Sequence, residues 1–102
     1  MKHSLPFAAT LTDALVRKVR EMEHHCRAQC PELVPAIIWC SSKRGEHFGL
    51  YAIESRCLTP DTLFRAGDVQ VHVAPPDQSR SAGRTLDWIE GVGITDVATP
   101  AI

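Results

Sequence analysis

The spacing of apolar residues early in the chain predicts one amphipathic helix over residues 13–29. Its apolar positions recur every three or four residues and form a single stripe: Leu15, Val19, Met22 and Cys26. Thr12 can cap the amino end, because a threonine hydroxyl accepts a hydrogen bond from an otherwise unpaired backbone N–H. The helix should end at Cys30, because Pro31 follows and the residue before a proline disfavours the α conformation.

After the helix the pattern changes to short apolar runs and alternations that are typical of β-strands. The predicted strands are residues 36–40, 46–54, 62–65, 69–73, 85–90 and 94–97. In the clearest alternation three valines share one face, while Gln70 and His72 share the other. Residues 77–82 can form one helical turn closed by Gly83, since glycine readily adopts the left-handed conformation. The chain therefore predicts an α+β fold, with the N-terminal helix packed on a small mixed β-sheet or β-sandwich of five to seven short strands.

A chain of 102 residues suits one domain. We expect its core over residues 11–97, with flexible segments at 1–10 and 98–102. The uncharged stretch Leu33–Ser42 is about half of the ~20 residues that a membrane span needs. Residues 1–9 lack a convincing signal-peptide pattern. We therefore expect a cytoplasmic protein without membrane contact, whose four cysteines are reduced thiols.

Charge excludes one broad class of partner. The chain has 11 basic and 12 acidic side chains, for a net charge of −1, and the basic residues are dispersed. No cationic tract is present to neutralise a row of phosphates. We therefore do not expect nucleic acid as a partner.

Two segments carry motifs that stand out. Leu11-Thr12-Asp13-Ala14 opens the predicted helix; residues 67–73 are followed, ten residues later, by Gly83 and then by residues 85–90. The first segment resembles the LT..A start of the HesB/IscA-like family of A-type iron–sulfur carriers. The second is similar to that family's GV.I.V strand, its short helical turn ending in glycine, and its T.(M/L)DY(V/I) strand. The resemblance spans about residues 11–93 and implies the family's compact, β-sandwich-like α+β domain.

The family's three ligand cysteines have no counterpart in the matching positions. In the family one lies in a G-C-x-G element of a hairpin, and two lie in a C-terminal C-G-C-G tail. Here the hairpin reads Gly45-Glu46-His47-Phe48-Gly49, with His47 near the expected cysteine, and residues 94–102 contain no cysteine. An iron–sulfur cluster needs several thiolates, or a few imidazoles, supplied together. The resemblance thus implies a carrier-like domain without the usual cluster ligands.

Cys40 and His47 are the candidate metal ligands. If residues 43–44 form a two-residue hairpin turn, the two side chains lie directly opposite each other with Cβ atoms about 5 Å apart. Such a pair could share a metal ion or form a thiolate–imidazolium pair. A three-residue turn with Gly45 in the left-handed conformation is equally natural and would place His47 opposite Ser41. The alternative role of Cys40 is core packing.

The other reactive side chains favour ordinary roles. Cys26 and Cys30 share a helical face, but Cys26 continues the apolar stripe, so a core-facing pair is favoured over a metal site. Cys57 follows Arg56, whose charge could favour the thiolate, yet no histidine is close in sequence to act as a base. We interpret His72 as a surface imidazole.

A polar patch is a weaker candidate for a protein interface. It comprises Asp77, Arg80, Arg84 and Trp88. Charged residues around an aromatic anchor are enriched at interfaces, although isolated patches are more often solvated surface.

The sequence therefore predicts a protein that is not an enzyme, since no triad order and no glycine-rich phosphate loop is present. The first hypothesis is an A-type-carrier-like domain that binds a protein partner of sulfur or iron–sulfur metabolism and holds no cofactor. The second is an iron or iron–sulfur cluster binder that uses Cys40 and His47, completed by a second copy in a homodimer. The third is a cysteine-dependent redox protein that acts through Cys57 or Cys40.

Overall fold

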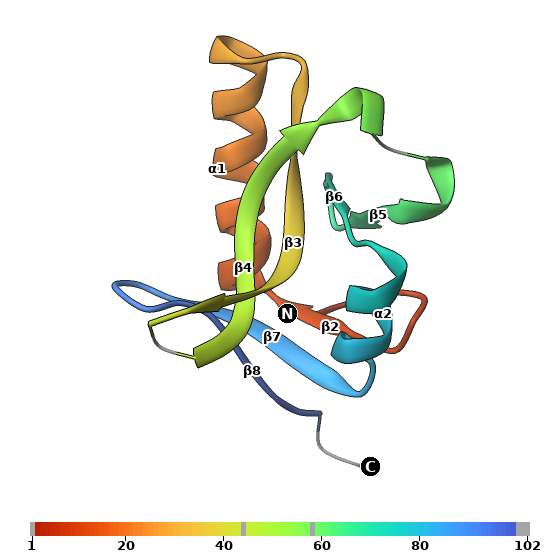
Figure 1. The fold of residues 1–102 in the computed structure, drawn as a ribbon, viewed down its shortest axis with the longest axis vertical. Helices are drawn as coiled ribbons and strands as arrows, with labels where there is room; N and C mark the ends of the chain where they lie inside the picture. Colours follow the sequence, from red (N-terminus) through yellow and green to blue (C-terminus); the bar gives the residue numbers. More distant parts are fainter. Residues whose placement is uncertain (1, 44, 58, 100–102) are drawn as a thin grey trace.

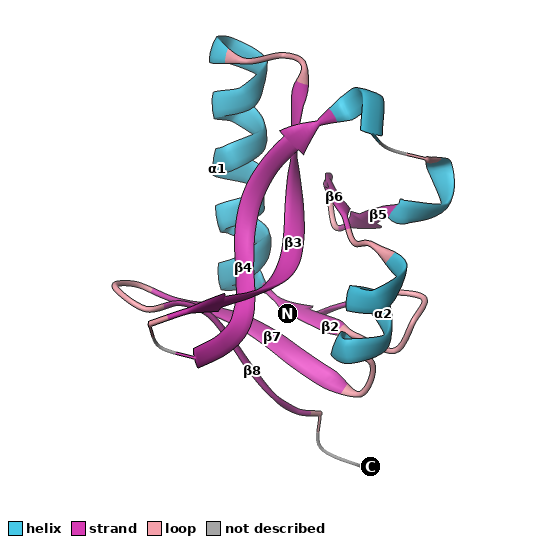
Figure 2. Ribbon diagram, in the orientation of Figure 1, coloured by secondary structure: helices cyan, strands magenta, loops and turns pink. Residues whose placement is uncertain are grey.

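The computed structural model describes residues 2–43, 45–57 and 59–99. Within these residues the protein is α+β, with two α-helices and two four-stranded sheets (Figures 1 and 2), so the predicted class is confirmed. In chain order the elements are β1 (Lys2–Ser4), β2 (Thr10–Thr12), α1 (Asp13–Gln29), β3 (Leu33–Ser42), β4 (Gly45–Glu54), the 3₁₀ turns η1 (Ser55–Cys57) and η2 (Pro60–Thr62), β5 (Leu63–Ala66), β6 (Val69–His72), α2 (Pro75–Ser81), β7 (Arg84–Ile89) and β8 (Gly93–Ala98).

Both sheets are mixed and share one plan. The first has the order β1-β2-β7-β8 and the second the order β4-β3-β6-β5. In each sheet the central pair is parallel, β2 with β7 and β3 with β6, and an antiparallel strand flanks each side. The long β3–β4 hairpin curves across the front of the molecule (Figure 1).

Helix α1 has the predicted ends. The Thr12 hydroxyl accepts a hydrogen bond from the Leu15 backbone N–H at 3.3 Å, and the Cys30 N–H donates to the Cys26 carbonyl at 2.7 Å. Along the predicted stripe Leu15, Val19 and Cys26 are buried, whereas Met22 is half-buried. The capping residue, the apolar stripe and the proline after the helix were therefore sufficient to predict where the helix begins and ends.

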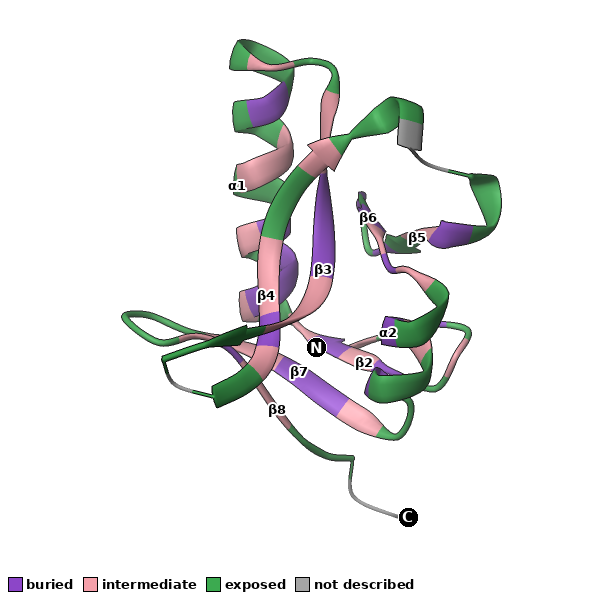
Figure 3. Ribbon diagram, viewed as in Figure 1, coloured by how far each residue is buried: buried purple, intermediate pink, exposed green. Residues whose placement is uncertain are grey.

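The core draws on α1 and on both sheets, as the buried segments in Figure 3 show. Its members are Leu5, Ala9, Leu11, Leu15, Val16, Val19, Ile37, Phe48, Ala66, Val69, Val71, Val73, Leu86 and Ile94. The three valines of the predicted alternation are all buried, as expected. Trp39 of β3 meets Phe48 of β4 edge-to-face, with ring centroids 4.8 Å apart. This contact fixes which face of the hairpin is turned inward.

The amino-terminal residues take part in the fold, which differs from the expectation of a flexible segment over residues 1–10. They include β1 and the first residue of β2, and they supply Leu5 and Ala9 to the core. Strands of three residues carry too little alternation to be predicted, so the described strands number eight where five to seven were expected. At the other end β8 extends to Ala98, and residues 100–102, expected to be flexible, lie outside the described residues.

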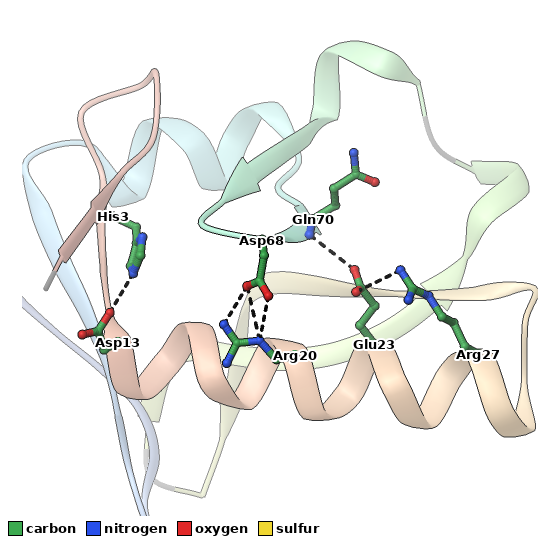
Figure 4. Close-up of polar contacts among 7 residues, drawn as sticks. All are labelled: His3, Asp13, Arg20, Glu23, Arg27, Asp68 and Gln70. Atoms are coloured by element: carbon green, nitrogen blue, oxygen red, sulfur yellow. Dashed lines mark hydrogen bonds and ion pairs between the residues drawn. The ribbon is translucent and has the colours of Figure 1, made fainter.

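The polar side of α1 is tied to neighbouring strands (Figure 4). Arg20 holds Asp68, in the turn between β5 and β6, at 2.6 Å. This hydrogen bond keeps the pKa of Asp68 below its usual range. Glu23 accepts from the Gln70 backbone N–H at 3.4 Å and pairs with Arg27 at 3.1 Å.

Neither helix within the described ranges is long and apolar enough to cross a membrane.

Candidate functional site

The β3–β4 register brings Cys40 opposite His47. Ser42 pairs with Gly45, so two residues separate the paired strands, and Cys40 pairs with His47. Of the two registers that the sequence allowed, the one that creates the candidate pair is present. The pair lies near the turn end of the hairpin.

Three side chains meet on the face of the hairpin that is turned away from the core. The Cys40 Sγ lies 3.8 Å from His47 Nε2 and 3.3 Å from Tyr51 Oη. Cys40 and His47 are half-buried and Tyr51 is 45% exposed, whereas Phe48, the neighbour of His47, is buried in the core. Because successive strand residues point to opposite faces, the cluster is accessible from solvent. We refer to Cys40, His47 and Tyr51 as the hairpin cluster.

The His47 ring is oriented by its own strand. Its Nδ1 lies 3.1 Å from the Gly45 carbonyl oxygen and 3.5 Å from the Ser42 hydroxyl. A carbonyl can only accept a hydrogen bond, so Nδ1 is the donor in this contact, and the other ring nitrogen, Nε2, faces Cys40. Histidines that bind metals usually donate their second ring N–H to a carbonyl or carboxylate in this way.

The separation of the two ligand atoms suits a shared metal ion. An ion placed at about 2.3 Å from a thiolate sulfur and about 2.0 Å from an imidazole nitrogen would subtend an angle of about 120° across the 3.8 Å gap. This angle is compatible with tetrahedral or trigonal coordination. Among the described residues no group of three or more His, Cys, Asp or Glu side chains gathers around one position. One copy of the described chain therefore offers two of these ligands, and coordination by four needs others.

An iron–sulfur cluster held in the manner of the A-type carriers does not fit these residues. Such a cluster is ligated by several thiolates, and the hairpin cluster contains one thiol, that of Cys40, with one imidazole. A single metal ion needs fewer thiolates than an iron–sulfur cluster does, and it matches the donor set better.

Sequence analysis missed Tyr51. Its ring lies across Gly49, where an added Cβ would come within 2.5 Å of Tyr51 Cε2. His47, Gly49 and Tyr51 alternate along β4 and so share a face, which is the signal that could have found it. The alternation shows that these residues share a face, but it does not show that the Tyr51 side chain extends along the strand as far as Cys40.

The helix cysteines behave as core residues. Cys26 is 4% exposed, and burial raises the pKa of its thiol, which keeps it protonated and unreactive. Cys30 is half-buried at the helix end. Cys26, Cys30 and Cys40 are not joined in disulfides, and the side chain of Cys57 lies outside the described residues.

The interpretation of His72 as a surface imidazole is correct only in part, because the residue is half-buried. Its Nδ1 is buried and has no hydrogen-bond partner among the described residues. Burial lowers the pKa of His72, and the nearby Asp77 carboxylate opposes this shift only in part. Strand β6 lies between β3 and β5, where His72 is paired with Ala36 on one side and with Leu63 on the other.

The charged side chains of the predicted polar patch have partners within the fold, and Asp77 and Arg80 pair with each other at 3.8 Å. Asp77 is only 7% exposed, and Arg80 lies over the Trp39 ring at 5.6 Å. Arg84 pairs with an acidic residue of β8, Asp96, at 2.9 Å. These internal partners favour the interpretation of the patch as ordinary protein surface.

Comparison with known proteins gave no match, either to a protein-family model or to a curated protein sequence.

Proposed function

We propose that this protein is a non-catalytic, A-type-carrier-like accessory domain that shares one metal ion with a second protein chain through Cys40 and His47. The observation that carries the proposal is the orientation of the His47 imidazole. Its Nδ1 is held by the Gly45 carbonyl, and its Nε2 faces the Cys40 Sγ at 3.8 Å. A thiol and a correctly oriented imidazole on an accessible face form half of a metal site.

The carrier-like part of the proposal is supported by what the motif residues do. Thr12 caps α1, and Gly83 follows α2 with a positive φ of 76°, as a glycine after a helix does. Val69 and Val71 of the GV.I.V-like strand are buried. We therefore propose a HesB-like domain. The departures from the family pattern include the hairpin, where His47 is near the expected cysteine and a different ligand set would follow from different side chains.

The shared ion follows from the number of ligands. A structural zinc-type ion takes four, and Cys40 with His47 supplies two. A second copy related by a twofold axis would add the same pair and give a Cys₂His₂ set. A partner of sulfur or iron–sulfur metabolism with its own exposed cysteines would serve equally. In either case the metal is the link between two chains, and no reaction is required of the domain.

The first experiment determines the metal, the acid-labile sulfide and the visible absorption of protein purified without oxygen. A single ion shared by two copies of the chain predicts about half a metal per chain and no sulfide. Stoichiometric sulfide would mean that a cluster is carried after all, by ligands other than those proposed.

The second experiment assigns the ligands. Cobalt(II), a spectroscopic substitute for zinc, is titrated into wild-type protein, Cys40→Ser, His47→Ala and His24→Ala. We expect a thiolate-to-cobalt charge-transfer band in the wild type and in His24→Ala. His24 is an exposed histidine of α1, so its substitution serves as the matched control. The band should disappear in Cys40→Ser. In His47→Ala the apparent affinity for cobalt(II) should fall at least tenfold. Equal binding by all four proteins, or none by the wild type, would refute the metal link and leave partner binding without a metal.

A further inference from the structure

We infer that Tyr51 is a positioning residue of the hairpin cluster, whose hydroxyl donates a hydrogen bond to the metal-bound thiolate of Cys40. This inference rests on the proposed metal site. It adds a residue that tunes the ligand rather than one that binds the metal. The Tyr51 Oη lies 3.3 Å from the Cys40 Sγ, which is a hydrogen-bond distance for sulfur.

The position of Tyr51 along β4 makes this contact unusual. His47, not Tyr51, is the residue opposite Cys40, and Tyr51 is paired with Ala36. Four residues of strand, or about 13 Å, separate positions 47 and 51. The tyrosine side chain must therefore lie lengthwise on the sheet and point toward the turn in order to reach the sulfur.

Gly49 is what allows the ring to lie there. A Cβ at this position would stand 2.5 Å from Tyr51 Cε2 and 3.0 Å from both Cζ and Oη. Atoms in real proteins do not approach so closely, so any other residue at position 49 would displace the ring. Because Gly49 has no side chain, the Tyr51 ring can lie over it and its hydroxyl can reach Cys40.

The chemistry assigns the direction of the bond. A neutral phenol is a donor, and a thiolate can only accept, so the proton lies between Oη and Sγ on the oxygen side. The bond stabilises the thiolate form of Cys40, which is the form that binds a metal ion. Hydrogen bonds to ionised groups are about twice as strong as neutral ones, so the bond should strengthen when the metal deprotonates the thiol.

A purely structural role for Tyr51 is the competing account, because an aromatic ring over a strand glycine also stabilises a sheet. Tyr51→Phe separates the two. It keeps the ring over Gly49 and removes only the hydroxyl. If Tyr51 serves the sheet alone, this variant should behave as the wild type in every metal measurement.

The test titrates cobalt(II), with zinc(II) competition, into wild-type protein, Tyr51→Phe, Gly49→Ala and the double variant. We expect Tyr51→Phe to weaken metal affinity about tenfold. The thiolate-to-cobalt band should also move to longer wavelength, because the sulfur lone pair loses a stabilising proton. The thermal unfolding of the metal-free protein should change little.

Gly49→Ala should reproduce both changes, and it should add little to them in the Tyr51→Phe background, because the two substitutions remove the same contact. If Gly49→Ala fails to fold, Tyr51→Phe alone decides the question. Unchanged affinity and an unchanged band in Tyr51→Phe would overturn the inference and leave the metal site intact. Absence of cobalt binding by the wild type would overturn both.

Discussion

Phe48 illustrates how single residues divide the hairpin into a core face and a site face. It is 1% exposed and contacts Trp39 edge-to-face, while the adjacent His47 belongs to the opposite face. Truncation of a buried aromatic ring removes apolar contacts and leaves a cavity. We expect Phe48→Ala to lower the free energy of unfolding by about 3–5 kcal/mol in urea titrations.

The matched control is Val97→Ala on β8, where the side chain is 59% exposed and the loss should stay within about 0.5 kcal/mol. A loss below about 1 kcal/mol in Phe48→Ala would mean that the hairpin is not anchored by this ring.

His72 makes stability depend on pH in a direction that the structure fixes. Burial lowers the pKa of this imidazole below 6.5 in the folded protein. The unfolded chain therefore binds a proton more readily than the folded chain does, and stability rises with pH. The contribution is complete above about pH 6.5 and is lost as the pH falls through the folded pKa.

We therefore expect the wild type to lose more thermal stability between about pH 7.5 and about pH 5.5 than His72→Gln does. Other histidines titrate in the same range, so the difference between the two proteins is the measured quantity. Identical pH profiles would show that position 72 is not protonated on unfolding.

The residues that sequence analysis misjudged show what a pattern omits. Alternation assigned His72 to the face opposite the valines, which is correct, but it could not show that β6 would become an interior strand. It likewise placed Tyr51 on the face of His47 without showing that Gly49 would let its ring lie along the strand. The burial of His72 therefore depends on strands distant in sequence, and the position of the Tyr51 ring depends on its contact with Gly49.

At the scale of elements, the hairpin register could have been decided from the two apolar faces. In the observed register Trp39 is opposite Phe48 and Ile37 is opposite Leu50. A slip by one residue would place Trp39 opposite Gly49 and would turn Phe48 to the face of Cys40. Packing of the two aromatic rings against each other is therefore the physical reason that Cys40 and His47 meet.

Helix α1 could be predicted to the residue because its signals are local. A capping threonine, an apolar stripe and a proline after the end all act within a few residues. The two short strands before α1 have no such signals and are held by pairing with each other and with β7. Local chemistry was therefore sufficient for the helix and insufficient for the strands.

The cap of α1 has a second role that connects it to a strand. The Thr12 hydroxyl accepts from the Leu15 N–H and donates to the Asp87 carboxylate of β7 at 2.5 Å. We expect Thr12→Ala to lower the free energy of unfolding by about 1–2 kcal/mol, since both bonds are lost. Thr12→Ser retains the hydroxyl and should lose much less. Equal losses in the two variants would assign the effect to the threonine methyl group.

At the scale of the whole molecule, the fold places the hairpin cluster on an accessible face while both sheets and α1 enclose the core. Because Cys40 and His47 come together only in the folded chain, a metal ion that binds them stabilises the fold by mass action. At a free concentration one hundred times the dissociation constant, the gain is about 2.7 kcal/mol. We expect zinc(II) to raise the melting temperature of the wild type and not that of Cys40→Ser.

The same linkage predicts the assembly. If two copies share one ion, half an equivalent of zinc(II) should double the sedimenting mass of the wild type, and excess zinc(II) should reverse the change as each chain acquires its own ion. Cys40→Ser and His47→Ala should remain at one mass throughout, because each leaves too few ligands at the interface. A wild-type chain that binds zinc(II) tightly without a change in mass would exclude the second copy as the source of the missing ligands. The search would then turn to a partner protein that supplies them.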